Sequence, residues 1–383
     1  MSLHTLFTRF KNNFFTSTPL VTVSISASAI LHNLRTYQKE YPGIACAPVL
    51  KSNAYGHGLV LIAKILDTEG LPFLVVDSLY EARILRNNGI TTPILIIGFV
   101  QPENILCNRL SKISYTITSL EQLQALVISA RRPLNVHIKI DTGMHRQGLL
   151  PEQISECIST IKNNSFIQLE GICSHFADAE NKDVSFTDLQ RKTWNEVVSV
   201  FKKTFPRIPY IHISGTAGAA HLTTAHENMI RLGIGLYGIN PSPFIALPLT
   251  PALEMKTVLS SVKPVKKGGH VGYNATYTAE KDMCVATVPV GYFEGVDRRL
   301  SNRGSFKIGN TFCPIVGRVS MNITSIDVSE VPHVKMGDSV TIMSAQAGDE
   351  NSVIHSAKKA GVIPWEILVH IPQHLKRVAT YDR

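Results

Sequence analysis

A lysine follows a buried apolar run near the start of the chain, and its surroundings favour covalent chemistry. Lys51 comes directly after residues 44–50, a run typical of a buried strand. Burial disfavours the charged ammonium, and a lysine that loses its proton can form a Schiff base with an aldehyde. The tight loop that follows contains Tyr55, whose hydroxyl can bind an anion, and Gly56 and Gly58, which we expect to let the backbone approach a ligand closely. The segment therefore suggests an aldehyde cofactor that carries a phosphate.

Further polar residues follow later apolar runs. Arg146 offers a planar guanidinium that suits a carboxylate or a phenolate, and strand alternation points Lys139 inward. His175, His212 and Arg231 each lie at or near the end of an apolar run. We expect these three side chains to form a hydrogen-bonded row.

Two glycine-containing turns near residue 220 suit a phosphate group. Thr216 precedes a helix-like segment and offers a hydroxyl and backbone donors, and Gly233 offers an unobstructed N–H. The phosphate sites of TIM-type barrels often lie near the seventh and eighth strands, where these turns would fall.

Alternation of short apolar runs and amphipathic segments predicts a (β/α)8 TIM-type barrel. The strand candidates are residues 44–50, 73–76, 94–97, 115–117, 136–140, 169–173, 210–213 and 229–236. In such a barrel the polar residues above converge at one mouth, at the C-terminal ends of the strands. A doubly wound sheet is the alternative, and it is disfavoured because no GxGxxG turn follows the first strand.

The alternation of strand and helix patterns ends near residue 240, and short strands dominate from about residue 253. Strands are predicted over residues 257–262, 284–289, 311–316, 323–328 and 339–342, with one helix over 353–360. We therefore expect an N-terminal extension (1–18), a barrel (19–250) and a mainly antiparallel β domain (251–383).

Composition limits the function and the compartment. The chain has 383 residues, is 44% hydrophobic and carries a formal net charge of +9 that is spread along it. No dense Lys/Arg block with interleaved aromatic residues is present, so no nucleic-acid partner is predicted, and no apolar stretch is long enough to span a membrane. Residues 1–18 lack the features of a secretory signal. Six cysteines without a CxxC pair predict no metal site and a reducing, cytoplasmic location.

The motifs, taken in order, resemble those of the alanine racemase family, fold-type III enzymes that use pyridoxal 5′-phosphate (PLP). The strongest is Lys-x-Asn-Ala-Tyr-Gly-His-Gly at 51–58. The others are Asp-Thr-Gly-Met-His-Arg at 141–146, Ser-His-Phe-Ala at 174–177, Arg-x-Gly-Ile-x-Leu-Tyr-Gly at 231–238, Val-Gly-Tyr-Asn-Ala-Thr-Tyr at 271–277 and Val-Gly-Arg-Val-Ser-Met-Asn at 316–322. The resemblance extends from about residue 20 to the C-terminus.

The resemblance implies a set of cofactor contacts. Lys51 would carry PLP covalently, and the other contacts would be Tyr55, His175, Thr216, Arg231, Gly233 and Ile234. Arg231 would face the pyridine nitrogen. Because a permanent cation cannot accept the ring proton, the pyridine would stay largely unprotonated and would be a weaker electron sink, so side reactions such as transamination should be suppressed.

The resemblance also implies two bases and a homodimer. Lys51 would serve one face of the substrate Cα, and Tyr273 of the partner subunit would serve the other, with His175 and Arg231 stabilising its phenolate. The substrate-binding residues would be Arg146, the backbone N–H of Met321, Tyr277 and Tyr292, and Lys139 would occupy a position that is carbamylated in some members. The implied activity is interconversion of L- and D-alanine, which supplies D-alanine for peptidoglycan.

Alternatives and departures remain beside this interpretation. A PLP-dependent amino-acid decarboxylase, or a racemase of broader specificity, would have the same fold. A non-catalytic PLP carrier is disfavoured by the β domain. The chain departs from the family pattern at Gly215 and at Asn322, and no C-terminal phosphate-binding tyrosine can be placed near residues 372–374.

Overall fold

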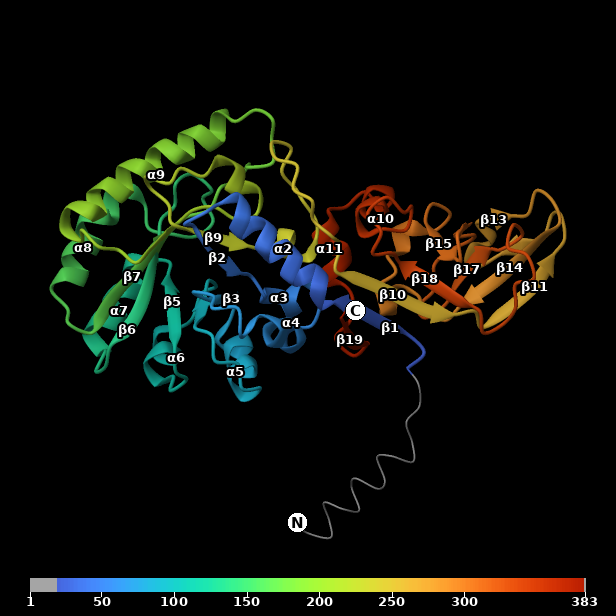
Figure 1. The fold of residues 1–383 in the computed structure, drawn as a ribbon, viewed down its shortest axis with the longest axis horizontal. Coiled ribbons are helices and arrows are strands. Elements are labelled where there is room, and N and C mark those ends of the chain that lie inside the picture. The colour runs from blue at the N-terminus through green and yellow to red at the C-terminus, as the bar shows by residue number, and fades with distance from the viewer. Residues whose placement is uncertain (1–18, 382–383) are drawn as a thin grey trace, which may run out of the picture.

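The computed structural model describes residues 19–381, which form two lobes (Figure 1). One lobe is a barrel surrounded by helices, and the other is built mainly from antiparallel strands. The predicted extension, residues 1–18, lies outside the described residues. The predicted fold class, an α/β barrel followed by a β domain, is confirmed.

Eight parallel strands form the barrel. A six-stranded sheet runs in the order β3-β4-β5-β6-β7-β8, and β2 pairs with β9 in parallel. A bridge between Val49 and Val75 joins β2 to β3, and a bond from Asn228 N to Ile211 O joins β9 to β8, so the ring closes. The doubly wound alternative is therefore excluded. The strands are β2 (Ala45–Pro48), β3 (Leu74–Val76), β4 (Ile94–Ile96), β5 (Ile113–Ile117), β6 (Leu134–Lys139), β7 (Ile167–Cys173), β8 (Tyr210–His212) and β9 (Met229–Leu232).

Helices cover the outside of the barrel (Figure 1). They are α4 (Leu59–Leu66), α5 (Leu79–Asn87), α6 (Pro102–Cys107), α7 (Leu120–Ser129), α8 (Ile154–Lys162) and α9 (Ser185–Thr204), with 3-10 turns η1 (Pro151–Gln153), η2 (Ala217–His221) and η3 (Ile234–Tyr237). Ser78 and Ser119 cap α5 and α7, since their hydroxyls accept bonds from the third residue of each helix. Helix α2 (Ala27–Glu40), which Ser26 caps, was not predicted from the sequence.

The C-terminal domain is organised around a six-stranded sheet in the order β16-β15-β18-β10-β1-β19. Its strands are β1 (Thr22–Ser26), β10 (Leu253–Val258), β15 (Ser305–Ile308), β16 (Thr311–Pro314), β18 (Ser339–Met343) and β19 (Lys376–Thr380). A three-stranded sheet of β11 (Ser261–Val265), β14 (Met283–Val288) and β17 (Thr324–Asp327) packs beside it, followed by α10 (Val353–Ala360) and α11 (Pro364–Val369). The single strand predicted over 257–262 was wrong, because β10 ends at Val258 and β11 begins at Ser261 in another sheet.

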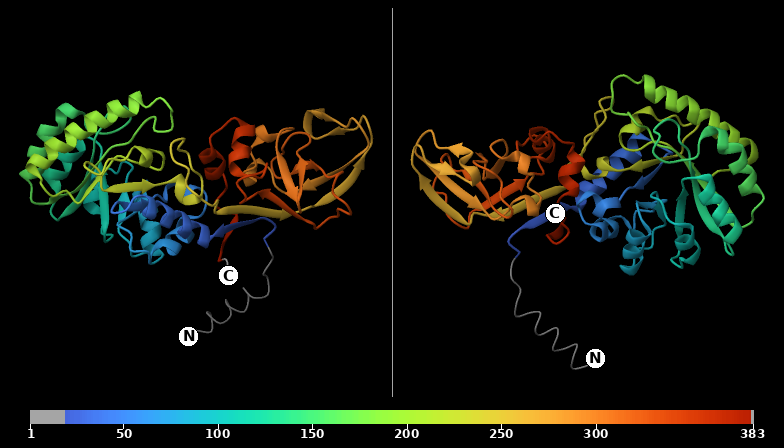
Figure 2. Two further views of the ribbon diagram at one scale, coloured as in Figure 1. Left: turned by 45° about the horizontal axis from the view of Figure 1, so that its top comes forward. Right: turned by 180° about the vertical axis from the view of Figure 1, so that it is seen from behind.

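The first strand of the chain connects the two lobes. β1 pairs antiparallel with β10 and parallel with β19, so it lies in the C-terminal sheet, and the chain then enters the barrel through α2 (Figure 2). Buried residues of both lobes form one continuous hydrophobic core. The geometry of the barrel mouth therefore depends on both domains.

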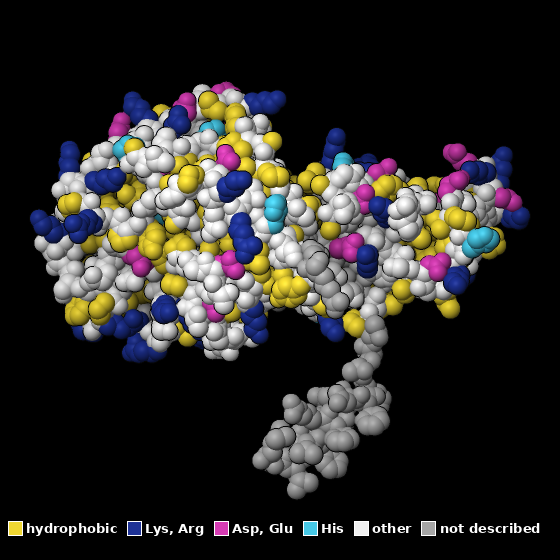
Figure 3. Space-filling model, viewed as in Figure 1, with side chains coloured by type: hydrophobic (Ala, Val, Ile, Leu, Met, Phe, Trp, Pro, Cys, Tyr) yellow, Lys and Arg dark blue, Asp and Glu magenta, His cyan; other side chains and the backbone are white. Residues whose placement is uncertain are grey.

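Charged side chains are spread over the described surface. In Figure 3 the Lys and Arg side chains on the visible face lie around the barrel and at the far end of the C-terminal domain, with Asp and Glu side chains among them. Among residues 19–381, every helix is too short or too polar to cross a membrane.

Candidate active site

A cavity of about 400 Å³ opens at the C-terminal ends of the barrel strands. Most of the barrel residues that the sequence singled out line it, namely Lys51, Tyr55, Lys139, Arg146, His175, Thr216, Arg231, Gly233 and Ile234, whereas His212, Gly56 and Gly58 do not. Because these residues come from strands at different points in the sequence, only closure of the barrel brings them together. The cavity combines amine, guanidinium, imidazole and hydroxyl groups in one place.

Lys51 begins a turn with unusual backbone geometry. Ser52, Asn53, Ala54 and Tyr55 all have φ between 52° and 57°, the left-handed region. Each non-glycine residue in this conformation costs about 1–2 kcal/mol of conformational free energy, so the surrounding structure must hold the turn in place. This geometry points both Lys51 and Tyr55 into the cavity.

The glycines after the turn serve packing between the domains and do not line the cavity, contrary to the expectation above. A Cβ on Gly56 would lie 2.0 Å from the backbone oxygen of Leu368 in α11, and one on Gly58 would lie 2.9 Å from the side chain of Arg377. Gly56 also accepts a hydrogen bond from Arg377 Nε at 2.7 Å through its carbonyl oxygen. The C-terminal domain therefore packs directly against the turn that begins at Lys51 (residues 51–56, the lysine turn).

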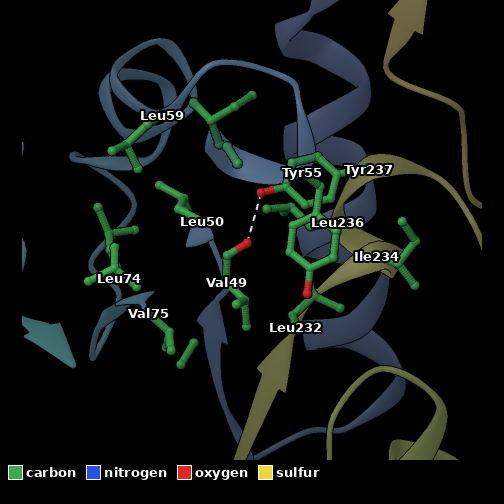
Figure 4. Packing of buried hydrophobic residues seen from close by; sticks show 14 of the residues in the cluster. Val49, Leu50, Tyr55, Leu59, Leu74, Val75, Leu232, Ile234, Leu236 and Tyr237 are labelled. Atoms are coloured by element: carbon green, nitrogen blue, oxygen red, sulfur yellow. Dashed lines mark hydrogen bonds between the residues drawn. The ribbon is translucent and has the colours of Figure 1, made fainter. Parts of the chain in front are cut away.

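Tyr55, Thr216 and Gly233 form a polar cradle at one end of the cavity. Thr216 Oγ1 accepts a bond from Gly233 N at 3.0 Å, and a Cβ on Gly233 would lie 2.8 Å from the Tyr55 hydroxyl. Tyr55 packs beside Tyr237, whose hydroxyl donates to Val49 O at 2.8 Å (Figure 4). Burial raises the pKa of Tyr55 to about 12, although Arg231 opposes the shift, so its phenol remains a donor. The two hydroxyls are neutral donors that suit a phosphate, but the Gly233 N–H, expected to be unobstructed, is bonded to Thr216 Oγ1 in this structure.

Arg231 is held by five hydrogen bonds, and the predicted row is confirmed. Nη1 donates to His212 Nδ1 and to His212 O, whereas Nη2 donates to Ser174 O, Ile213 O and His175 Nδ1. These bonds occupy the two terminal nitrogens and leave the Nε–H outside the set. The guanidinium is thus fixed in one orientation at the cavity floor.

The row continues through the barrel interior, which the sequence analysis missed. His212 Nε2 lies 2.9 Å from His137 Nδ1, and His137 Nε2 lies 3.2 Å from Glu170 Oε2. Burial by itself would raise the pKa of Glu170, but bonds led by that from His137 lower it overall, so the group is a carboxylate. Strand alternation was a signal for His137, which it points inward with Lys139, but not for Glu170, which lies at a register shift in the β6–β7 pairing.

The chemistry of the row assigns one proton to each ring. A guanidinium only donates, so His212 Nδ1 must accept and its proton lies on Nε2. The ring of His137 then accepts at Nδ1 and donates from Nε2 to Glu170. The row therefore runs from a cation to an anion through two neutral histidines.

Positive charge outweighs negative charge in the cavity, which four Lys and Arg side chains and two carboxylates, Asp178 and Glu180, line. Lys139 lines it with Lys51, Arg146 and Arg231. Burial is the main reason that the pKa of Lys139 is lowered; Cys173 opposes the shift, and the three cations add to it. Burial, followed by Arg231, lowers the pKa of His175 to about 3. Such a cavity favours anionic ligands.

Four buried histidines predict a loss of stability in mild acid. Burial lowers the pKa of His57 to about 4 and of His175 to about 3, and it also lowers the pKa of His137 and His212. Below the unfolded pKa near 6.5 the unfolded chain binds protons that the native chain does not, so native stability falls as pH decreases from about 6.5 towards 4. We expect a loss of up to about 1.4 kcal/mol per pH unit for each histidine. Urea unfolding at pH 7.5 and 5.5 checks this, and equal or higher stability at pH 5.5 would contradict it.

The four singled-out residues of the β domain lie away from this cavity within the chain. Tyr273 is 66% exposed, Met321 55% and Tyr292 43%, and Tyr277 is partly buried in β13 (Tyr277–Thr278). Tyr292 and Met321 are neighbours, since Phe293 N donates to Met321 O at 2.9 Å. None of the four lines the cavity.

One departure from the family pattern, Asn322, has a local explanation. Asn322 Nδ2 donates to the buried Glu294 at 2.7 Å, so an aspartate at this position would place two carboxylates in contact. Near the C-terminus, Trp365 of α11 reaches the cavity. Trp365 was not predicted as a site residue because α11 was not predicted, although Pro364 at its first position is a helix-start signal.

Comparisons with known proteins agree with this architecture. Residues 25–241 match the alanine racemase N-terminal domain, and residues 252–379 match the alanine racemase C-terminal domain. An alanine racemase of Sorangium cellulosum is 33% identical over 369 residues, covering 92% of this chain and 97% of that protein. Alanine racemase 1 of Caldanaerobacter subterraneus is 35% identical over 367 residues, covering 94% of this chain and 95% of that protein.

Solved structures give the same result. An alanine racemase from Clostridium difficile 630 superposes with a TM-score of 0.89 at 30% identity, covering 96% of this chain and 97% of that one. The alanine racemase of Bacillus anthracis with bound L-Ala-P gives a TM-score of 0.86 at 30% identity, covering 96% of each chain. Together with the family matches to both domains, these likenesses identify the chain as a member of the alanine racemase family of amino-acid isomerases.

Proposed function

We propose that this protein interconverts L- and D-alanine with PLP by a two-base proton transfer and supplies D-alanine for peptidoglycan. The observation that carries the proposal is the convergence of Lys51, the phosphate cradle and the Arg231 row in one cavity. We propose a cytoplasmic location, which the free thiols of all six cysteines support.

The cavity fits PLP on the chemistry of its lining. Lys51 Nζ would hold the cofactor covalently, while Tyr55, Thr216 and the Gly233 and Ile234 backbone would hold its phosphate. Arg231 would face the pyridine nitrogen, and its Nε–H is the guanidinium donor left outside the five bonds above. The chemistry that bound PLP supplies is withdrawal of electrons from the substrate Cα, which makes the Cα proton removable.

Two bases move the proton in this proposal. Lys51 Nζ takes or returns it on one face of Cα, and Tyr273 Oη of the partner subunit does so on the other. Tyr273 is largely exposed in its own chain, which supports a role in a second subunit of a homodimer. His175 accepts from Arg231 at Nδ1, so its neutral ring carries the proton on Nε2 and can donate it to the Tyr273 oxygen.

Substrate recognition rests on the remaining predicted residues. Arg146 and the Met321 backbone N–H would bind the carboxylate, and Tyr277 and Tyr292 would narrow the entrance to favour a small side chain. Arg146 lines the cavity in this chain, whereas the other three belong to the β domain and would act, like Tyr273, across the dimer.

We further propose that Lys139 is carbamylated. Its pKa is lowered mainly by burial, and a neutral amine is the form that reacts with CO2. The product would be an anion among three cations of the cavity and could orient Arg146. Protein equilibrated with 13C-bicarbonate should give a carbamate carbonyl signal in its 13C spectrum, and Lys139→Ala should lack it. An identical signal in the variant, or none in the wild type, would contradict the assignment.

Racemisation and decarboxylation are separated by one assay. Incubation with L-alanine and PLP should abolish optical rotation without release of CO2, whereas a decarboxylase of the same fold would release CO2. The same assay with L-serine measures how broad the specificity is. Release of CO2, or unchanged rotation with every amino acid tried, would overturn the proposed function.

A further inference from the structure

One carboxylate ties the lysine turn to the end of the neighbouring barrel strand. Glu81, in the first turn of α5, accepts a bond from Ser52 N at 2.7 Å through Oε1. Its other oxygen, Oε2, accepts from Asp77 N at 2.8 Å. Ser52 directly follows Lys51, and Asp77 directly follows β3. Glu81 therefore joins two loops of adjacent strands at the barrel mouth.

The Ser52 N–H needs a partner from outside its own turn. The first N–H groups of any helical turn have no acceptor within it, and here the bond from Ala54 N to Leu50 O is the first that the turn makes itself. The turn is also strained, since Ser52 to Tyr55 are all left-handed. A bond to a charged acceptor is stronger than one to a neutral acceptor, so Glu81 is well suited to hold it.

A second helix of the barrel shows what Glu81 does beyond capping. Gln122 occupies the same position in α7, where its N–H donates to Ser119 Oγ and its Oε1 accepts from Thr118 N at 2.9 Å. Glu81 makes the same two bonds, with Ser78 Oγ and Asp77 N. A glutamine is therefore sufficient for this cap. What the carboxylate adds is a second acceptor oxygen, and in this structure that oxygen binds Ser52 N.

We propose that Glu81 is a positioning residue that holds Lys51 and Tyr55 in the cavity through the Ser52 N–H. The inference rests on the proposed function for its effect on catalysis, but not for the contact itself. Lys51 would carry the cofactor and Tyr55 would bind its phosphate, so a looser turn weakens both contacts together. Arg146 lies in the loop after β6, away from the lysine turn in the chain, and substrate binding should be little affected.

The Glu81→Gln variant isolates the second bond. Its amide oxygen can keep the bond to Asp77 N, but its NH2 group cannot accept from Ser52 N. In the purified full chain we expect the amides of residues 52–58 to exchange hydrogen about tenfold or more faster, as measured by mass spectrometry. We expect the dissociation constant of PLP to rise and kcat to fall by about the same factor, with KM for alanine changing by less than about twofold. The matched control is Glu121→Gln, which removes a charge from the first turn of α7, where Glu121 interacts only within its own helix start.

The outcomes separate this inference from the proposed function. Wild-type exchange of residues 52–58 in Glu81→Gln, or equal acceleration in Glu121→Gln, would overturn the contact's role. Faster exchange with unchanged PLP affinity and kcat would overturn the positioning role. A wild-type chain that binds no PLP and racemises nothing would refute the proposed function, whereas the exchange data would still decide the role of Glu81. Thermal unfolding of each variant identifies a general loss of fold.

Discussion

Replacing Lys51 with alanine is expected to abolish covalent attachment of PLP and to lower racemisation by at least about a thousandfold, because one residue supplies both the covalent link and one of the two bases. The fold should survive. The left-handed turn is held by its backbone bonds and by Glu81, none of which involves the Lys51 side chain, and that side chain faces the cavity instead of the core. The measurements are cofactor absorbance after gel filtration and the rate of alanine racemisation in each direction.

Lys51→Arg is the matched control for charge. Arginine keeps a cation at the same place, but its guanidinium is effectively always protonated and cannot form a Schiff base. The account therefore predicts that Lys51→Arg is as inactive as Lys51→Ala, even if phosphate contacts still bind some PLP noncovalently. Substantial racemisation by either variant would contradict the role of Lys51.

The Tyr273→Phe variant is expected to keep bound PLP and to lose about 10²- to 10⁴-fold in racemisation, the range for loss of one acid–base group. In the proposed mechanism its hydroxyl acts at the substrate Cα, whereas Lys51 and the phosphate cradle hold the cofactor, so cofactor affinity should be unchanged. L- and D-alanine present their Cα protons to different bases, one to Lys51 and the other to Tyr273, and in D2O each base can exchange the proton that it removes. Exchange of the Cα proton should therefore persist for one enantiomer and be lost for the other.

Tyr381→Phe is the control for this variant, because Tyr381 is 69% exposed and lies at the C-terminal end of the described chain. It should racemise at the wild-type rate. If Tyr273→Phe did the same in both directions, the two-base assignment would be wrong. Sedimentation of a fully active monomer would contradict the sharing of Tyr273 between subunits.

The barrel could be predicted from sequence because its strands are short apolar runs with helices of regular period between them. The helix predicted over 353–360 has the bounds that the structure gives α10. The assignment of β1 to the C-terminal sheet could not be predicted, since only pairing with β10 and β19, far along the chain, determines it. The same limit explains the merged prediction of β10 and β11, whose separation depends on which sheet each one joins.

Site residues could be predicted from the sequence where they lie at or just after the C-terminal end of a predicted strand. Strand ends meet at a barrel mouth, so Lys51, Arg146 and His175 could be grouped without coordinates. The role of Gly56 could not be predicted in the same way, because its neighbour Leu368 lies more than three hundred residues away. His137 and Glu170 were missed for a related reason, since a polar row through a barrel interior requires the register of three strands to be known.

Borohydride reduction of the purified protein with PLP, followed by peptide mapping, tests the central claim most directly. Reduction converts a Schiff base into a stable secondary amine, so the modified peptide identifies the lysine that carries the cofactor. The account predicts a single pyridoxyl group on Lys51 and none on Lys139, the other lysine of the cavity. Label on a different lysine, or a protein that takes up no cofactor, would contradict it.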